Sequence, residues 1–154
     1  MKALIQRVKY ARCVIDGETV SEIGKGFLIF LGVDHADTER EAEVLAAKTA
    51  KLRIFEDADG KMNLSLLDVH GGALVISNFT LCADTSHGNR PDFFGAARPE
   101  TAKPLYEAFV RHLQTSVSDV GTGVFGADMQ IELTNDGPVT LMLDTAAFSA
   151  KKRG

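Results

Sequence analysis

Phe27-Leu28-Ile29-Phe30-Leu31 decides the fold class, because it is apolar at five consecutive positions. A strand with one face in water alternates apolar and polar residues, whereas an unbroken apolar run suits a strand covered on both faces. A second run of this kind, Ala73-Leu74-Val75-Ile76, follows later in the chain. Both runs predict buried strands of one sheet.

Further strands are predicted on either side of these two runs. Leu4 to Val8 is suited to a first strand, and residues 13–20 to a hairpin, because Asp16-Gly17 tolerates the positive φ of a tight turn. Near the C-terminus, Met129 to Leu133 alternates and Val139 to Leu143 is largely apolar. These two segments are predicted to be strands joined by a turn.

Two main helices are predicted between the strands. Thr38 and Glu41 have capping-box spacing, and apolar residues then recur at helical spacing, so residues 38–53 are expected to form an amphipathic helix. A second helix is predicted from about Thr101, which places Pro104 in the tolerated first turn. The order β-β-β-α-β-α-β-β predicts a mixed α/β fold with a curved, barrel-like, mostly antiparallel sheet.

Length and composition agree with one globular domain. The chain has 154 residues, of which 45% are hydrophobic and 25% charged, with a net charge of −4. We expect one domain over residues 1–145 and a flexible tail over residues 146–154. No apolar run is long enough to span a membrane, and the two cysteines, Cys13 and Cys82, suit a reducing cytoplasm. The acidic balance argues against a broadly basic nucleic-acid binder.

Several familiar motifs carry no function here. Gly121-Thr122-Gly123-Val124-Phe125-Gly126 matches G-x-G-x-x-G, but it follows a helix and precedes a strand, so it predicts a flexible connection. The four histidines are dispersed along the sequence and form no metal-ligand pattern. These are His35, His70, His87 and His112. We therefore expect neither a metal nor a cofactor.

Two segments remain as candidates for a functional site. Ser77-Asn78-Phe79-Thr80-Leu81 brings small hydroxyl groups to the end of an apolar strand, although such residues also simply terminate strands. Asn135-Asp136-Gly137-Pro138-Val139-Thr140 is a turn that a hairpin alone would explain. Because proline has no N–H, this turn also offers carbonyl oxygens to a donor such as an ammonium group.

Together these two segments resemble the signatures of the D-aminoacyl-tRNA deacylases, the D-tyrosyl-tRNA deacylase family. The resemblance extends from Met1 to about Leu143 and includes Gly60 to Leu66 and Asn89-Arg90-Pro91. One departure is Asn78, where the family has a glutamine that is longer by one methylene.

The resemblance implies a homodimer that hydrolyses the ester between a D-amino acid and the 3′ end of tRNA. It implies that the Gly137-Pro138 peptide bond is cis and that this pair enters the active site of the partner subunit. Its carbonyls would hold the substrate α-amino group, so that an L side chain meets this wall and a D side chain points away. Glycine would pass the same filter. Neither a membrane nor DNA is an expected partner.

The resemblance also assigns roles to individual residues. Ser77 to Thr80 would form the opposite wall, with the Phe79 N–H as oxyanion donor and Asn78 bracing the pocket. Thr80 is a possible nucleophile, but no obvious base accompanies it, so we favour water attack assisted by the ribose 2′-hydroxyl, with Thr80 orienting groups.

Other residues would support the site. Arg7 and Asn135 would support the Gly-Pro turn, and the region of Arg90 would contact tRNA. Phe125 and Met129 would line the pocket rim, although a purely apolar core role fits them nearly as well.

Two alternatives stay open. The first is a related editing deacylase that removes L-alanine from tRNA and has a trans Gly-Pro bond and a roomier pocket. The second is a small dimeric module that docks tRNA or DNA without turnover. Hydrolysis assays with D- and L-aminoacyl-tRNA would separate the three functions.

Overall fold

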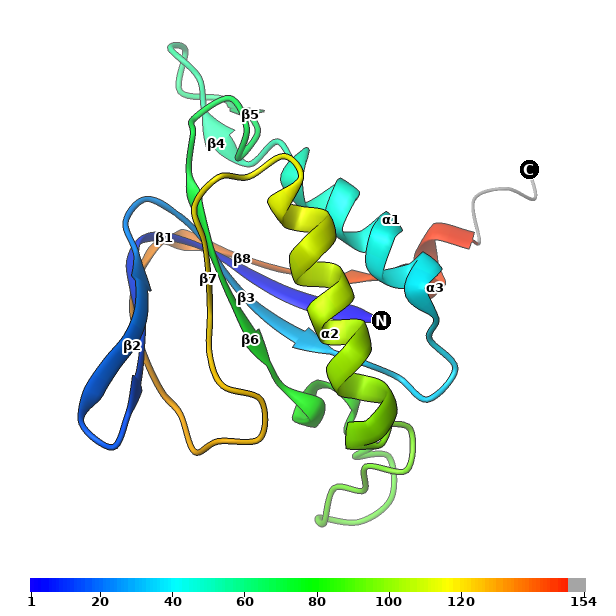
Figure 1. Ribbon diagram of the computed structural model, residues 1–154. Helices are drawn as coiled ribbons and strands as arrows, with labels where there is room; N and C mark the ends of the chain where they lie inside the picture. Colours follow the sequence, from blue (N-terminus) through cyan, green and yellow to red (C-terminus); the bar gives the residue numbers. More distant parts are fainter. Residues whose placement is uncertain (150–154) are drawn as a thin grey trace.

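The computed structural model describes residues 1–149, in which a six-stranded, nearly closed sheet carries two long helices on one face (Figure 1). The sheet contains β1 (Lys2–Ile15), β2 (Glu18–Ile23), β3 (Gly26–Gly32), β6 (Gly72–Ser77), β7 (Val120–Thr122) and β8 (Gln130–Asp144). A separate hairpin consists of β4 (Phe55–Glu56) and β5 (Met62–Leu64). The helices are α1 (Glu39–Ala50), α2 (Pro99–Gln114), the 3₁₀ helix η1 (Phe79–Cys82) and the short α3 (Thr145–Ser149).

β1 organises the sheet, because it pairs antiparallel with three other strands. Ala11 lies opposite Ile23 of β2 and Val8 opposite Gly26 of β3, and the pairing with β2 shifts register between Cys13 and Val14. β8 also pairs antiparallel with β1, while the β3–β6 and β6–β7 pairs are parallel. Ser21 Oγ donates to the Thr122 carbonyl over 2.6 Å and so links β2 to β7. The predicted curved, mostly antiparallel mixed α/β domain is confirmed.

The apolar run that predicted a doubly covered strand is buried on both faces. Phe27 and Ile29 belong to the large core cluster under the two helices, and Leu28 to a smaller cluster on the other face. All three side chains are fully buried. Helix α2 begins at Pro99, slightly before the expected Thr101, because proline suits the first helical turn. Both predicted main helices are therefore present.

The predicted turn between two C-terminal strands is wrong in its topology. Both halves of β8 run antiparallel to the same strand, β1, so the chain does not reverse. Thr140 lies opposite Gln6 and Asn135 opposite Val8, which leaves residues 136–139 opposite Arg7 alone. The turn residues instead form a bend that bulges from one continuous strand.

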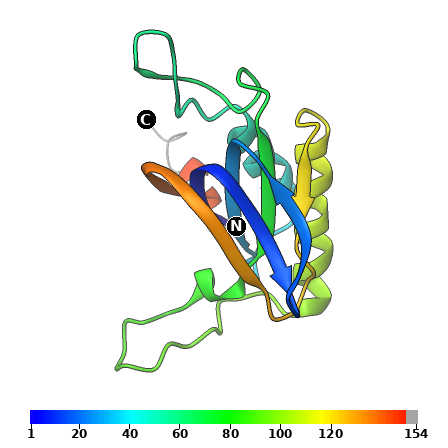
Figure 2. The ribbon, with the colours of Figure 1, turned by 90° about the vertical axis from the view of Figure 1, so that its left-hand side faces the viewer.

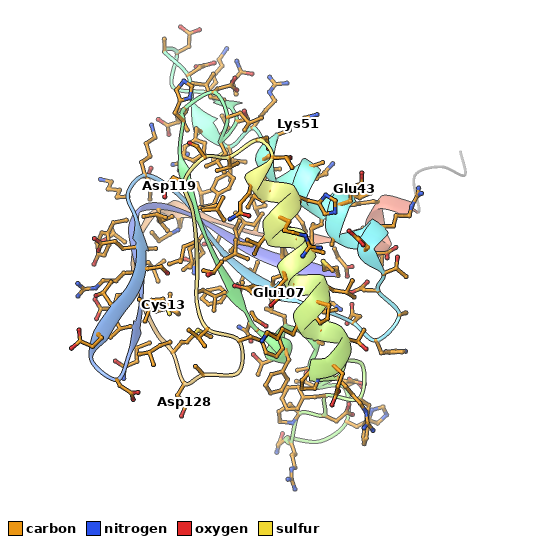
Figure 3. All side chains as sticks on the ribbon, viewed as in Figure 1. Cys13, Glu43, Lys51, Glu107, Asp119 and Asp128 are labelled. Atoms are coloured by element: carbon orange, nitrogen blue, oxygen red, sulfur yellow. The ribbon has the colours of Figure 1, made fainter. Side chains whose placement is uncertain are left out.

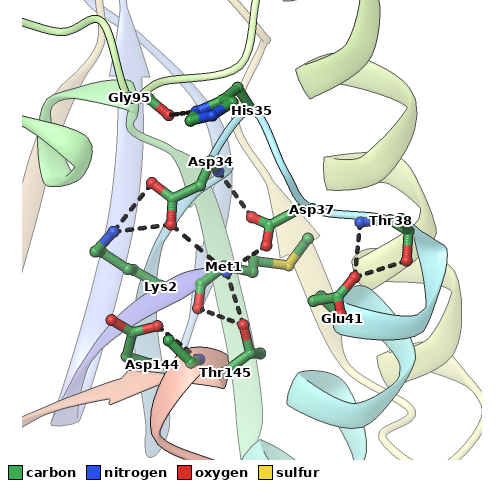
Figure 4. A network of polar contacts seen from close by, with 11 residues as sticks. Met1, Lys2, Asp34, His35, Asp37, Thr38, Glu41, Gly95, Asp144 and Thr145 are labelled. Atoms are coloured by element: carbon green, nitrogen blue, oxygen red, sulfur yellow. Dashed lines mark hydrogen bonds and ion pairs between the residues drawn. The ribbon is translucent and has the colours of Figure 1, made fainter. Parts of the chain in front are cut away.

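The N-terminus joins two other segments of the chain, the loop after β3 and the start of α3, through polar contacts (Figure 4). The Met1 ammonium donates to Asp37 Oδ1 over 2.6 Å and to Thr145 Oγ1 over 2.8 Å. Lys2 Nζ lies 2.8 Å from Asp34 Oδ2. Residues 145–149 form α3, so the first part of the tail expected to be flexible is helical, and residues 150–154 lie outside the described residues.

Candidate active site

A cavity of about 590 Å³ opens where β6 ends and η1 begins. The segments that enclose it are the ends of β3 and β6, residues 93–99, the first turns of α2, and residues 125–129. Five of the residues expected at the site line it together. These are Ser77, Asn78, Phe79, Phe125 and Met129. A concave, largely apolar pocket with a few polar groups is the usual form of a small-molecule site.

Asn78 fixes the start of η1 at the cavity rim. Its backbone N–H donates to the Leu31 carbonyl over 2.8 Å, and its Oδ1 accepts the Thr80 N–H over 3.1 Å. The Thr80 hydroxyl donates to the same oxygen. The Asn78 side chain therefore acts as the cap of η1.

Thr80 is exposed and is not among the residues that line the cavity. A neutral amide oxygen accepts the hydrogen bond from its hydroxyl and cannot take the proton as a general base would. This geometry gives no support to Thr80 as an activated nucleophile.

Phe79 presents both a ring and a main-chain donor at the rim. Its side chain is 57% exposed and meets the Phe93 ring edge to face, with 5.1 Å between the ring centroids. As the first residue of η1, Phe79 has an N–H that no carbonyl of the helix can accept. Such a group is free to donate to an oxygen atom bound in the cavity.

The bend in β8 forms a second candidate element. Gly137 and Pro138 are exposed, and the peptide bond between them is cis. A Cβ atom on Gly137 would collide with the Val139 backbone nitrogen and the Asn135 side chain, so only glycine fits this path. The bend is therefore both accessible and sterically tight.

Two side chains hold the bend from beneath. Buried Arg7 donates from Nε to the Asp136 carbonyl over 3.1 Å and from Nη1 to the Ile54 carbonyl over 2.7 Å. Asn135 Nδ2 donates to the Arg7 carbonyl over 3.1 Å and to the Val139 carbonyl over 3.0 Å. Together these bonds tie the bend to β1 and to the segment before β4.

Within one chain the bend and the cavity are separate. Figure 2 shows the bend of orange β8 and green η1 toward opposite ends of the same side of the molecule. Gly137 and Pro138 are not among the residues that line the cavity. The expected site residues thus form two clusters rather than one.

A family model described as D-Tyr-tRNA(Tyr) deacylase matches residues 4–144. This chain belongs to the D-Tyr-tRNA(Tyr) deacylase family. A curated relative from Chloroflexus aurantiacus, named D-aminoacyl-tRNA deacylase, is 56% identical over 99% of this chain and 96% of its own. A Thermus aquaticus relative of the same name is 54% identical over 95% of this chain and 96% of its own. The family expected from the sequence is confirmed.

Two solved structures share the fold of this deacylase-family chain. One, described as c-Myc DNA Unwinding Element Binding Protein, has a TM-score of 0.89 and 39% identity over 94% of this chain and 98% of its own. The other, described as a probable eukaryotic D-amino acid tRNA deacylase, has a TM-score of 0.79 and 15% identity over 93% of this chain and 98% of its own. The second comparison bears on the fold alone.

Sequence reasoning missed part of the cavity wall in this deacylase-family protein. Phe93, Arg98 and Asp128 line the cavity, but their polar segments have no periodic pattern that would mark them. Arg90, expected to contact tRNA, is exposed on the loop between residues 84 and 98 and does not line the cavity.

Side chains suited to metal or thiol chemistry do not converge here. Residues 1–149 hold no group of three or more His, Cys, Asp or Glu side chains arranged to bind a metal ion. Burial, with a hydrogen bond to Asp34, raises the pKa of Cys82 to about 12, so this thiol stays protonated at neutral pH. No helix in the described part of the chain is long and apolar enough to cross a membrane.

Proposed function

We propose that this protein hydrolyses the ester bond of D-aminoacyl-tRNA and releases free tRNA and the D-amino acid. The observation that supports this function most is the structure of the two segments that carry the family resemblance. Ser77 to Phe79 lines a cavity, and Asn135 to Thr140 forms a braced, exposed bend. The curated relatives carry the name of this activity over nearly the full chain.

The proposed enzyme is a homodimer in which the bend of each chain enters the cavity of the other. The bend is exposed and lies away from the cavity of its own chain, so a second chain is needed to combine them. The main-chain carbonyls of Gly137 and Pro138 would then accept hydrogen bonds from the substrate ammonium group. An L side chain would collide with the bend, a D side chain would point away from it, and glycine would pass.

The proposed reaction uses water as the nucleophile. Water attacks the ester carbonyl carbon, and the Phe79 N–H stabilises the negative charge that develops on the carbonyl oxygen. The bond to the ribose 3′-oxygen breaks, and that oxygen takes a proton with help from the neighbouring 2′-hydroxyl. An aminoacyl ester is already activated, so positioning and oriented dipoles suffice, and Thr80 only orients groups.

A stereochemical assay tests this function. Purified protein is incubated with D-tyrosyl-tRNA, L-tyrosyl-tRNA, L-alanyl-tRNA and glycyl-tRNA, and the remaining ester is measured over time. We expect the D-ester to be hydrolysed at least a hundredfold faster than either L-ester, and glycyl-tRNA to be hydrolysed as well. A preference for L-alanyl-tRNA would instead assign the chain to the related editing activity.

One observation favours a second candidate, a nucleic-acid docking module without turnover. A solved structure with 39% identity is described as a DNA unwinding element binding protein. The net charge of −4 weighs against a broad DNA-binding face. Binding of D-tyrosyl-tRNA or duplex DNA while the ester stays intact at enzyme excess would support the module.

We place the enzyme in the cytoplasm, where its two free cysteines remain reduced.

A further inference from the structure

A cationic cleft lies at the C-terminal end of α1, apart from the cavity. It has a volume of about 350 Å³ and is lined by Ala47, Lys48, Lys51, Leu52 and Arg53. Three of these five side chains are cations, and none is an acid. Figure 3 shows Lys51 toward the opposite end of the molecule from Asp128, which lines the cavity. This cationic cleft is thus a separate feature of the surface.

None of the cations of the cationic cleft forms a direct ion pair with a carboxylate within residues 1–149, and the charge of Arg53 helps to lower the pKa of the Asp68 carboxyl. Arg53 donates from Nε to the Asn63 carbonyl over 2.9 Å and from Nη2 to the Asn63 side-chain oxygen, and both acceptors are neutral. Lys48 Nζ lies 5.2 Å from the centre of the Phe148 ring, and the Lys51 side chain is exposed. Within residues 1–149, no carboxylate oxygen is within 4.0 Å of any of the three cations.

This concentration of positive charge runs against the overall balance of the chain. The protein carries a net charge of −4, so a polyanion is attracted only where cations gather locally. An arginine fork matches the two free oxygens of a phosphodiester, and lysine adds a mobile point charge. The chemistry of the cleft therefore suits the phosphate backbone of a nucleic acid.

Hydrogen bonds connect the cationic cleft to the bend of β8. Arg53 directly precedes Ile54, whose carbonyl accepts a hydrogen bond from Arg7 Nη1. The same guanidinium donates from Nε to the carbonyl of Asp136, the residue before Gly137. In the proposed dimer the bend enters the mouth of the partner's cavity, and these bonds tie the segment that carries Arg53 to that bend. An RNA strand that ends in the cavity must pass this mouth.

We propose that the cationic cleft binds backbone phosphates of the tRNA acceptor end whose aminoacyl ester occupies the partner's cavity. The inference rests on the proposed function and adds to it the surface that holds the RNA. Lys51 and Arg53 are binding residues in this scheme and do not touch the reacting ester. Each subunit thus contributes the bend and the cleft to one site, and the cavity to the other.

Two substrates separate RNA binding from chemistry. D-tyrosyl-tRNA carries the acceptor-end phosphates, whereas the D-tyrosyl ester of adenosine has none. Each phosphate contact makes the association constant fall by about threefold when salt rises from 50 to 200 mM. The double variant Lys51→Ala/Arg53→Ala removes two such contacts and is expected to raise KM for the tRNA by about tenfold at the lower salt concentration. The slope of log K against the logarithm of the salt concentration is expected to become less negative by about 1.4 to 1.8. Hydrolysis of the adenosine ester is expected to keep its rate.

Control variants guard against trivial effects. Arg40→Ala removes a cation from the exposed N-terminal part of α1, outside the cleft, and is expected to leave both substrates unaffected. Arg53→Lys keeps the charge and is expected to recover most of the tRNA affinity. If the double variant keeps the KM and the salt dependence of the wild type, the cationic cleft does not bind tRNA phosphates, while the proposed function stays intact. Equal losses on both substrates would show a structural role instead. Wild-type protein that leaves both esters intact would overturn the proposed function itself.

Discussion

The cavity and the bend of β8 are built in opposite ways. The cavity is a hollow that chain segments far apart in the sequence surround, and its walls are mostly apolar. The bend is a projection of a few residues with exposed main chain, held by Arg7 and Asn135 through hydrogen bonds to backbone carbonyls. In the proposed dimer, a hollow without a reactive side chain and a projection rich in carbonyls would be complementary halves of a site. The comparison teaches that, in the proposed function, recognition would depend on the position of the backbone rather than on a reactive side chain.

The largest effect on activity is expected from Gly137→Ala, which displaces the bend and leaves the cavity unchanged. A Cβ atom at this position would collide with the Val139 backbone nitrogen, so the bend must move. A displacement of about 1 Å in a positioning element costs about a hundredfold in rate, so we expect at least that loss on D-tyrosyl-tRNA. Because the bend is exposed, the free energy of unfolding is expected to fall by only about 1 kcal/mol. Single-turnover hydrolysis and urea denaturation measure the two effects.

Gly24→Ala is the matched control for this substitution. A Cβ atom at Gly24 would have no neighbour within 4 Å, and its φ lies outside the left-handed region. We expect full activity and a stability change within about 0.5 kcal/mol. Full activity of Gly137→Ala would show that the bend takes no part in recognition.

Thr80→Ala tests the other half of the comparison and has a smaller expected effect. The hydroxyl donates to the Asn78 side-chain oxygen, and the Thr80 N–H keeps its own bond to that oxygen after the substitution. We expect kcat on D-tyrosyl-tRNA to fall by less than about tenfold, because in the proposed reaction backbone donors and the substrate 2′-hydroxyl assist the attack of water. Thr80→Ser is expected to restore the rate. A loss of about a thousandfold or more in a folded protein would identify Thr80 as the nucleophile.

The sequence predicted the elements whose signals are local. The runs at Phe27 to Leu31 and Ala73 to Ile76 predicted buried strands, because an apolar residue at every position requires cover on both faces. The direction of the chain after Asn135 was not predictable in this way. Turn residues favour a bend, but only pairing of both halves with β1 decides that the strand continues.

The residues of the candidate site were likewise predictable only where a local sequence signature marks them. Ser77, Phe79 and Gly137 became candidates through family signatures, and the first two line the cavity. Phe93 and Arg98 also line it but lie in a polar segment without periodicity. The long-range bond from Arg7 to the Ile54 carbonyl joins residues whose contact depends on the tertiary fold. A cavity wall made from distant segments leaves no pattern along the chain.

The smallest effect on activity is expected from a substitution in the polar cluster around Asp34. This cluster belongs neither to the cavity nor to the bend. Burial alone would raise the pKa of Asp34, but hydrogen bonds from Lys2 and Cys82, with the positive charges of Lys2 and the N-terminus, hold it below its ordinary value. Asp34→Asn removes these charge-assisted bonds and is expected to lower the free energy of unfolding by about 1–2 kcal/mol at pH 7. The hydrolysis rate per folded molecule is expected to stay unchanged.

The pH dependence of that difference follows from the direction of each shift. Because the folded pKa of Asp34 is lowered, its contribution is present above the unfolded value of about 3.9 and is lost as pH falls through the folded pKa. Hydrogen bonding to Asp34 raises the pKa of Lys2 against the opposing effect of burial, so that contribution is lost only as pH rises through a value above 10.5. Wild type and Asp34→Asn are therefore expected to differ by a constant amount between about pH 5 and 7 and to converge in acid. Urea denaturation at several pH values measures this difference, and convergence near neutral pH would contradict it.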